Sequence, residues 1–219
     1  MDREMKDSGI EWIGMIPKEW EVNRVKMFYN IIGGSGFPEV LQGRDNGDFP
    51  FLKASDINGL DKFVSTANNY VSTEDVRVNR FKVIPVKSVV MAKIGESMKK
   101  NHRKINLVEC IVDNNLQALE LISNSLLHEF AFYYWRCVDM AWYDNNGAVP
   151  CLNNKLLLNS VIPIPPLHEQ QAIADFLDEK CSKIDQTIEQ KQALIKQLQE
   201  YKQSLIYECI TGKRCVEER

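Results

Sequence analysis

The sequence contains no run of 18 apolar residues and no apolar segment near its N-terminus. A helix needs about 20 predominantly apolar residues to cross a bilayer, and a secretory signal needs an apolar stretch close to its start. The six cysteines form no CxxC pair and show no repeated spacing, so they support neither a disulfide framework nor a zinc site. We therefore expect a cytoplasmic protein with reduced thiols and no membrane partner.

Sequence patterns of common catalytic and cofactor sites are absent as well. The histidines at positions 102, 128 and 168 include no HExxH pair, and no GxSxG motif occurs. The glycine cluster Gly33–Gly36 is not followed by Lys-Ser or Lys-Thr, so it predicts a turn rather than a phosphate-binding loop. Cys151 has no visible catalytic partner. We therefore expect no catalytic residue, metal site or cofactor in this chain.

The charge of the chain is unevenly distributed. The formal net charge of −3 argues by itself against a nucleic-acid-binding protein. However, the segment from Val76 to Lys104 carries nine basic residues against the single acid Glu96, so its charge is +8 and that of the remainder is −11. A confined basic zone on an acidic protein is typical of a phosphate-binding surface. The alternative is a solvated face whose lysines only keep a sheet edge soluble. The nine basic residues are Arg77, Arg80, Lys82, Lys87, Lys93, Lys99, Lys100, Arg103 and Lys104.

The C-terminal part of the chain predicts one long helix from Leu167 to about Cys209. Three prolines at positions 163, 165 and 166 oppose helix before Leu167, and Gly212 is a typical residue just past a helix end. Between these limits, apolar positions recur in alternating steps of four and three, a 3.5-residue period that predicts a coiled-coil seam. The seam is Leu177, Cys181, Ile184, Ile188, Lys191, Ile195, Leu198, Lys202, Leu205 and Cys209.

Such a helix is on the order of 60 Å long, which exceeds the diameter of a domain of about 150 residues. We therefore expect it to extend beyond the globular part and to pair with another helix, rather than to remain a solvated charged helix. Two of the ten seam positions are Lys191 and Lys202. A cation in a seam weakens packing but can restrict register and the choice of partner.

The first 166 residues predict one globular domain. A helix is expected from Asn124 or Ser125 to about Trp142, and a short turn near residues 153–158. The segment Gly9–Trp20 is too short and broken for a helix of consequence. Several strands with one internal helix predict an α+β fold with a mixed sheet, followed by one long coiled-coil helix. The expected strands cover residues 49–52, 63–64, 70–71, 81–84, 88–94, 105–112 and 161–164.

Five segments, in order along the chain, together resemble the specificity (S) subunit of type I restriction-modification systems. The last of them, IPIPPLHEQQAIADFLDEKCSKIDQTI, is the most specific. The five segments are Lys6–Lys26, Phe51–Gly59, Val89–Lys100, Gly147–Asn153 and Ile162–Ile188.

The resemblance implies a non-catalytic subunit with three parts: a target-recognition domain over residues 1–166, a spacer helix over 167–210 and a tail over 211–219. The domain would read half of a split site in double-stranded DNA. Methyltransferase (M) subunits, which bind S-adenosylmethionine, would dock on this subunit, and a restriction and translocase (R) subunit would join for cleavage. Members of the family usually carry two recognition domains and two helices, whereas this sequence has one of each.

The chain therefore resembles a half-length specificity subunit, which we expect to form a homodimer through an antiparallel coiled coil. The alternative within the family is a truncated, silent specificity cassette. Outside the family, two further alternatives are a coiled-coil scaffold whose globular part binds protein, and an enzyme that uses Cys151 or the glycine cluster.

The candidate phosphate contacts are Lys53, Lys93, Lys99, Lys100, Arg103 and Lys104. The candidate base-reading residues are Asn145, Asn146 and Lys53. The amides of Asn114, Asn115 and Gln117 are suited either to base edges or to turns and buried hydrogen bonds.

Overall fold

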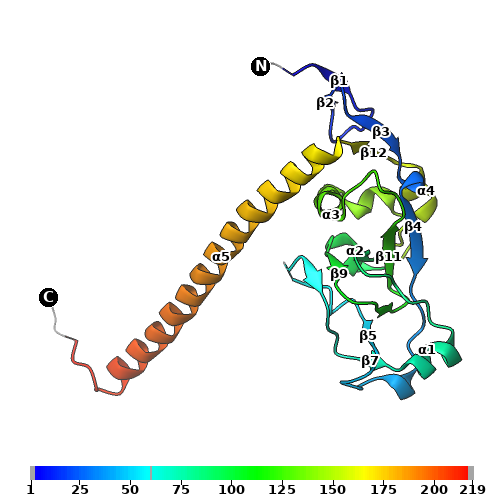
Figure 1. Cartoon of the computed structure of the whole chain (residues 1–219). Coiled ribbons are helices and arrows are strands. Elements are labelled where there is room, and N and C mark those ends of the chain that lie inside the picture. Colours follow the sequence, from blue (N-terminus) through cyan, green and yellow to red (C-terminus); the bar gives the residue numbers. More distant parts are fainter. Residues whose placement is uncertain (1–2, 60, 217–219) are drawn as a thin grey trace. The chain divides into compact units, whose positions relative to one another are not determined.

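The structure is a computed structural model that describes residues 3–59 and 61–216. The chain divides into two compact units, Met1–Gln171 and Ala172–Arg219. The first unit combines four small sheets with short helices, and the second consists mainly of one long helix (Figure 1). The predicted α+β class is therefore confirmed. Among the described residues, no helix has the length and apolar character needed to cross a membrane.

The largest sheet has five strands in the order β4-β11-β8-β9-β6. It is mixed, as predicted, because β6 runs parallel to β9 and the other pairs are antiparallel. A smaller sheet has the order β10-β5-β7. The strands of these two sheets are β4 (Tyr29–Gly33), β5 (Phe49–Leu52), β6 (Phe63–Val64), β7 (Tyr70–Val71), β8 (Val89–Ala92), β9 (Arg103–Asn106), β10 (Ile111–Val112) and β11 (Leu116–Leu121).

Two further sheets have two strands each, and both are antiparallel. One pairs β1 (Met5–Asp7) with β2 (Met15–Pro17), and the other pairs β3 (Glu21–Arg24) with β12 (Val161–Ile164). The helices are α1 (Thr73–Asn79), α2 (Glu96–Lys99), α3 (His128–Cys137), α4 (Asn154–Asn159) and α5 (Leu167–Ile210). Short 3₁₀ turns cover Val25–Met27, Glu39–Leu41 and Met140–Tyr143.

The glycine cluster lies where the two main sheets meet. A Cβ atom on Gly34 would stand 1.7 Å from the carbonyl oxygen of Asp113, so only glycine fits at this approach of two backbones. Ser35 then donates its amide hydrogen to the carbonyl of Val112 at 2.9 Å. The cluster thus connects β4 to the end of β10.

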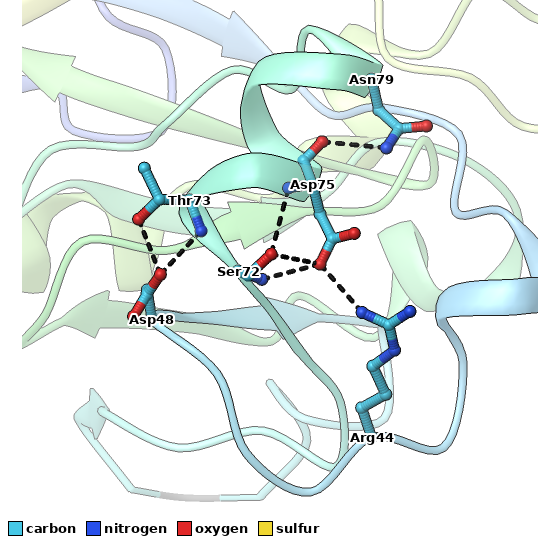
Figure 2. Close-up of polar contacts among 6 residues, drawn as sticks. All are labelled: Arg44, Asp48, Ser72, Thr73, Asp75 and Asn79. Carbon is cyan, nitrogen blue, oxygen red and sulfur yellow. Dashed lines mark hydrogen bonds and ion pairs between the residues drawn. The ribbon is translucent and has the colours of Figure 1, made fainter.

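The N-terminus of α1 is held by a dense set of polar contacts (Figure 2). The Ser72 hydroxyl accepts from the Asp75 amide, and the Asp75 carboxylate accepts from the Ser72 amide at 2.9 Å, which is a capping box. Arg44 forms an ion pair with Asp75 at 2.9 Å. The Asp48 carboxylate accepts from both the amide and the hydroxyl of Thr73 at 2.7 Å. These hydrogen bonds lower the pKa of Asp48 and of Asp75, so their stabilising effect is present at neutral pH and is lost as the pH falls through those lowered pKa values.

Some predicted elements differ from the observed ones. The segment Phe81–Ile84 is not a strand, and only Ile84 forms an isolated bridge, with Cys110, just before Pro85. The predicted strand over 105–112 splits into β9 and β10 around an exposed stretch at 107–109. The predicted helix to Trp142 ends at Cys137, because Val138 is extended, and a 3₁₀ turn follows it. The expected turn near 153–158 is the short helix α4, capped by the Asn153 side chain.

Arg103 and Lys104 are buried, which differs from their predicted place on a phosphate-binding surface. All four residues of β9 are buried, since β9 is an inner strand of the five-stranded sheet and α3 packs on it. The Arg103 guanidinium donates to the main-chain and side-chain oxygens of Asn101 and, at 2.6 Å, to the Val138 carbonyl. The Lys104 ammonium lies 3.5 Å from the Asp61 carboxylate. We therefore leave both residues out of the candidate contacts.

The long helix α5 agrees with its prediction at both ends. It begins at Leu167, directly after the prolines, and Gly212 follows its end with a φ of 70° and donates its amide hydrogen to the Cys209 carbonyl at 3.3 Å. Its first turn belongs to the globular unit, where Glu169 accepts from the Trp20 indole and the buried Gln170 bonds the main chain of residues 125, 127 and 165. From Ala172 onward the helix belongs to the second unit, and its seam residues Ile184, Ile195 and Leu198 are each more than half exposed.

We expect Arg103→Met to lower the free energy of unfolding by about 1–3 kcal/mol, since the Val138 carbonyl and two Asn101 oxygens lose a charged donor in a buried place. Urea denaturation followed by tryptophan fluorescence measures this. The exposed Lys99→Met is the matched control and should change stability by no more than about 0.5 kcal/mol. Equal urea midpoints for the two variants would contradict the stabilising role of this network.

Gly34→Ala should destabilise the globular unit by about 1–3 kcal/mol or more, because the added methyl group meets main-chain atoms that cannot move aside freely. Gly36→Ala is the control, since a Cβ there has no heavy atom within 4 Å. Thermal unfolding of both variants should separate them by several degrees. Equal melting temperatures for Gly34→Ala and Gly36→Ala would contradict the close approach of the two backbones at Gly34.

Candidate nucleic-acid interface

The candidate residues Lys93, Lys99, Lys100, Asn145 and Asn146 lie on segments that hydrogen bonds join directly. Lys93 follows β8; its amide donates to the Asn115 carbonyl at 2.8 Å, and its own carbonyl accepts from the Leu152 amide at 2.9 Å. The Gly95 amide donates to the Pro150 carbonyl at 2.8 Å just before α2 begins. The end of β8, α2 and the segment 150–152 therefore lie side by side.

The loop at 144–152 presents two exposed amide side chains. Its base is closed by the Asn145 amide, which donates to the Cys151 carbonyl, and by the Cys151 amide, which donates to the Asp144 carboxylate, both at 2.9 Å. Asn146 has a φ of 56°, a left-handed conformation that asparagine adopts more readily than most residues. Asn145 and Asn146 are exposed, so a rigid base carries two amides that face solvent.

Helix α2 and the residue after it supply two exposed cations. Lys99 and Lys100 are both exposed at the C-terminal end of this helix. Lys99 lies 3.2 Å from the Glu96 carboxylate, but an ion pair between two exposed side chains contributes about 0–1 kcal/mol. A phosphate can therefore replace Glu96 as the partner of Lys99 at little cost. We call Lys93, Lys99, Lys100, Asn145 and Asn146 the α2 surface.

A partly buried network ties the residues just after α2 to the core. Asn101, just beyond α2, has a φ of 56° and donates through its amide to the Asp139 carboxylate at 2.8 Å. Its side-chain oxygen accepts from Arg103 and from the Met140 amide, each at 2.9 Å. The hydrogen bond from Asn101 is the main cause that lowers the pKa of Asp139. The sequence analysis missed Asn101 and Asp139. The signal for Asn101 is that asparagine tolerates a left-handed conformation at a helix end.

Lys53 lies at the end of a strand of the smaller sheet. It follows β5 in the smaller sheet, and its amide donates to the Asp56 carboxylate at 2.7 Å. Its ammonium donates to the Gln42 side chain at 3.2 Å and stands 4.9 Å from the centre of the Phe37 ring. Its ammonium group is therefore occupied by Gln42 and Phe37.

Of the side-chain amides of Asn114, Asn115 and Gln117, which suit either base edges or internal hydrogen bonds, two have internal partners. Gln117 is fully buried on β11, and its side chain donates to Asn154 at 3.1 Å. The side chain of Asn115 donates to the Asp113 carboxylate at 3.0 Å. Gln117 therefore cannot reach a base edge without unfolding β11, which fits the structural alternative.

Cys151 is built into the loop that carries the α2 surface, and it pairs with Ile94 in an isolated bridge. Among the residues that the structure describes, no three His, Cys, Asp or Glu side chains gather where they could hold a metal ion.

Two solved structures share this fold. One, from work on complex assembly and conformational transition of the type I R-M system, aligns over 93% of this chain and 48% of its own, with a TM-score of 0.70 and 18% identity. The HsdS subunit from Thermoanaerobacter tengcongensis aligns over 83% of this chain and 41% of its own, with a TM-score of 0.57 and 21% identity. At these identities the likeness concerns the fold alone.

Curated relatives give the same indication at the level of sequence. The MjaX type I restriction enzyme specificity subunit of Methanocaldococcus jannaschii is 27% identical over 212 residues, and the MjaIX specificity subunit of the same organism is 24% identical over 189. These alignments cover 92% and 82% of this chain but only 45% and 41% of the relatives, so the chain spans less than half of their length. Residues 17–200 match the family described as the Type I restriction modification DNA specificity domain, and the chain therefore belongs to this family.

Proposed function

We propose that this chain is the DNA sequence-specificity subunit of a type I restriction-modification complex and has no catalytic residues of its own. The observation that carries the proposal is the α2 surface, where three lysines and two exposed amides lie on segments joined by main-chain hydrogen bonds, in a chain of net charge −3 that belongs to a DNA specificity family. Cations near exposed hydrogen-bonding amides are what a DNA-reading surface requires, since phosphate contacts position a protein and base contacts specify the sequence.

Each part of the α2 surface has a distinct role in this proposal. Lys93, Lys99 and Lys100 contact the phosphate backbone. Asn145 and Asn146 reach base edges, where an amide forms a bidentate pair with adenine. Lys53 supplies a further contact outside this surface. Arg103 and Lys104 have no contact with DNA, because their charged groups are engaged inside the globular unit.

The complex would be completed by other chains. Methyltransferase subunits with bound S-adenosylmethionine dock on this subunit and modify the DNA, and a restriction and translocase subunit joins for cleavage. Residues 167–210 act as the spacer between two recognition domains. Two copies of this chain supply the two recognition domains through an antiparallel coiled coil of their long helices. Each domain then reads half of a bipartite site.

Lys99→Ala and Lys100→Ala should each weaken binding to all DNA sequences alike and reduce the slope of log K against log salt by roughly one. Fluorescence anisotropy across a salt series, with the methyltransferase present, measures both effects. Lys82→Ala removes the same charge from an exposed site outside the α2 surface and should leave the slope unchanged. An unchanged affinity and slope in both α2 variants would refute the phosphate contacts, and absence of DNA binding by the native complex would favour a protein-binding scaffold.

The methylated site should be an inverted repeat with a nonspecific spacer, since a two-fold dimer presents the same domain to each half-site. Sequencing of modified bases in cells that express this chain with its cognate methyltransferase identifies the site. Two different half-sites would exclude simple self-pairing, and a complete lack of modification would favour the silent cassette.

A further inference from the structure

The second unit has a polarised charge distribution along its helix. Residues 172–189 carry five acids and two lysines, a net charge of −3, whereas residues 190–214 carry five basic residues and two acids, a net charge of +3. An antiparallel pair of these helices sets each acidic half against a basic half, while a parallel pair sets like charges together. Complementary charges across a coiled coil select partner and orientation. A second copy of this chain in antiparallel orientation is therefore the partner that fits this helix.

The two lysines of the seam discriminate among the registers that such a pair can adopt. Three registers, related by shifts of seven residues, keep at least eight of the ten seam positions in contact. In the central one, Lys191 faces Ile195, Ile184 faces Lys202 and Ile188 faces Leu198 of the other copy, so each lysine lies against an apolar residue. Every one of the ten seam positions is then matched by another, with Leu177 facing Cys209 and Cys181 facing Leu205.

Each shifted register carries a specific penalty. In one, Lys191 faces Lys202, and like charges set together across an interface cost several kcal/mol in general. In the other, Cys209 faces Gln170, which is fully buried in the globular unit, where it bonds the carbonyls of Ser125 and Pro165. That register leaves the end of the seam without a partner surface.

Residues beside the seam favour the same choice. Lys180 and Glu208 each directly precede a seam cysteine, so they lie on the same side of their helices, and both are about half exposed. The central register brings Lys180 of one copy close to Glu208 of the other, at both ends of the pair. Flanking positions of this kind form the interhelical ion pairs of coiled coils.

We propose that Lys191 and Lys202 fix the register of an antiparallel homodimer so that Lys191 of one copy faces Ile195 of the other. This inference rests on the self-pairing in the proposed function and adds to it which residues face one another. The lysines weaken the seam and in return exclude the neighbouring register in which they would meet.

Disulfide trapping distinguishes the registers, because a disulfide forms only between cysteines whose Cα atoms lie about 4.4–6.8 Å apart. The starting chain is full length, with the exposed Cys137 and Cys215 changed to serine. L205C should be joined to Cys181 of the other copy under mild oxidation, and L177C should be joined to Cys209. L198C and I184C are the matched controls, which trap with Cys181 or Cys209 only in the two shifted registers. Peptide mapping by mass spectrometry identifies the joined residues.

A second arm tests the lysines themselves. In the I184C chain, K202L removes the clash of the shifted register, so the band that joins I184C to Cys209 should rise by about tenfold or more. Trapping of L198C or I184C in the lysine-containing chain would overturn the register, as would joining of Cys181 or Cys209 to itself, which indicates a parallel pair. A monomer in sedimentation at the trapping concentration would instead refute self-pairing, and with it this inference, while leaving DNA recognition by the α2 surface untouched.

Discussion

The Arg103 guanidinium is a charge held inside the globular unit by oxygen atoms of Asn101 and Val138. Burial lowers its pKa to about 10, so it stays protonated at neutral pH and requires those acceptors to remain in place. The acceptors lie just after α2 and just after α3. A single buried cation thereby bonds the chain just beyond both helices, and it ties the end of α2, with Lys99 and the following Lys100, to the core.

The same contact shows why one part of the fold escaped prediction. Apolar spacing correctly placed a helix in the region of α3, because such spacing reports which side of a segment faces the core. It does not report where the helix ends. Val138 is extended, and its carbonyl accepts from Arg103, 35 residues away in sequence. The apolar periodicity of the residues around Val138 carries no information about a contact with a residue so far away in sequence.

Helix α5 was predictable throughout because its signals are local. The prolines before Leu167, the 3.5-residue period and Gly212 all act within a few residues of the structure they determine. The basic segment behaved differently. Composition alone cannot distinguish Lys99, exposed at the end of a short helix, from Lys104, buried on an inner strand. The sequence RKIN gives no apolar signal for β9, and its burial follows from its place between β8 and β6. The sequence therefore indicated a basic surface but not which cations form it.

In the proposed dimer, a fixed distance between the two recognition domains would explain why a seam that carries two lysines can be preferable to a fully apolar one. A slip of one heptad displaces one helix along the other by about 10.5 Å, at 1.5 Å per residue. Along B-DNA this equals about three base pairs, at 3.4 Å each. In the proposed dimer, two domains that read half-sites would tolerate no such change, since each would then meet the wrong bases. An apolar seam without Lys191 and Lys202 would bind more tightly yet would permit the neighbouring register in which these two positions meet. Under this proposal the helix has to provide a single length of separation rather than maximal affinity, and cations in its seam would meet that requirement.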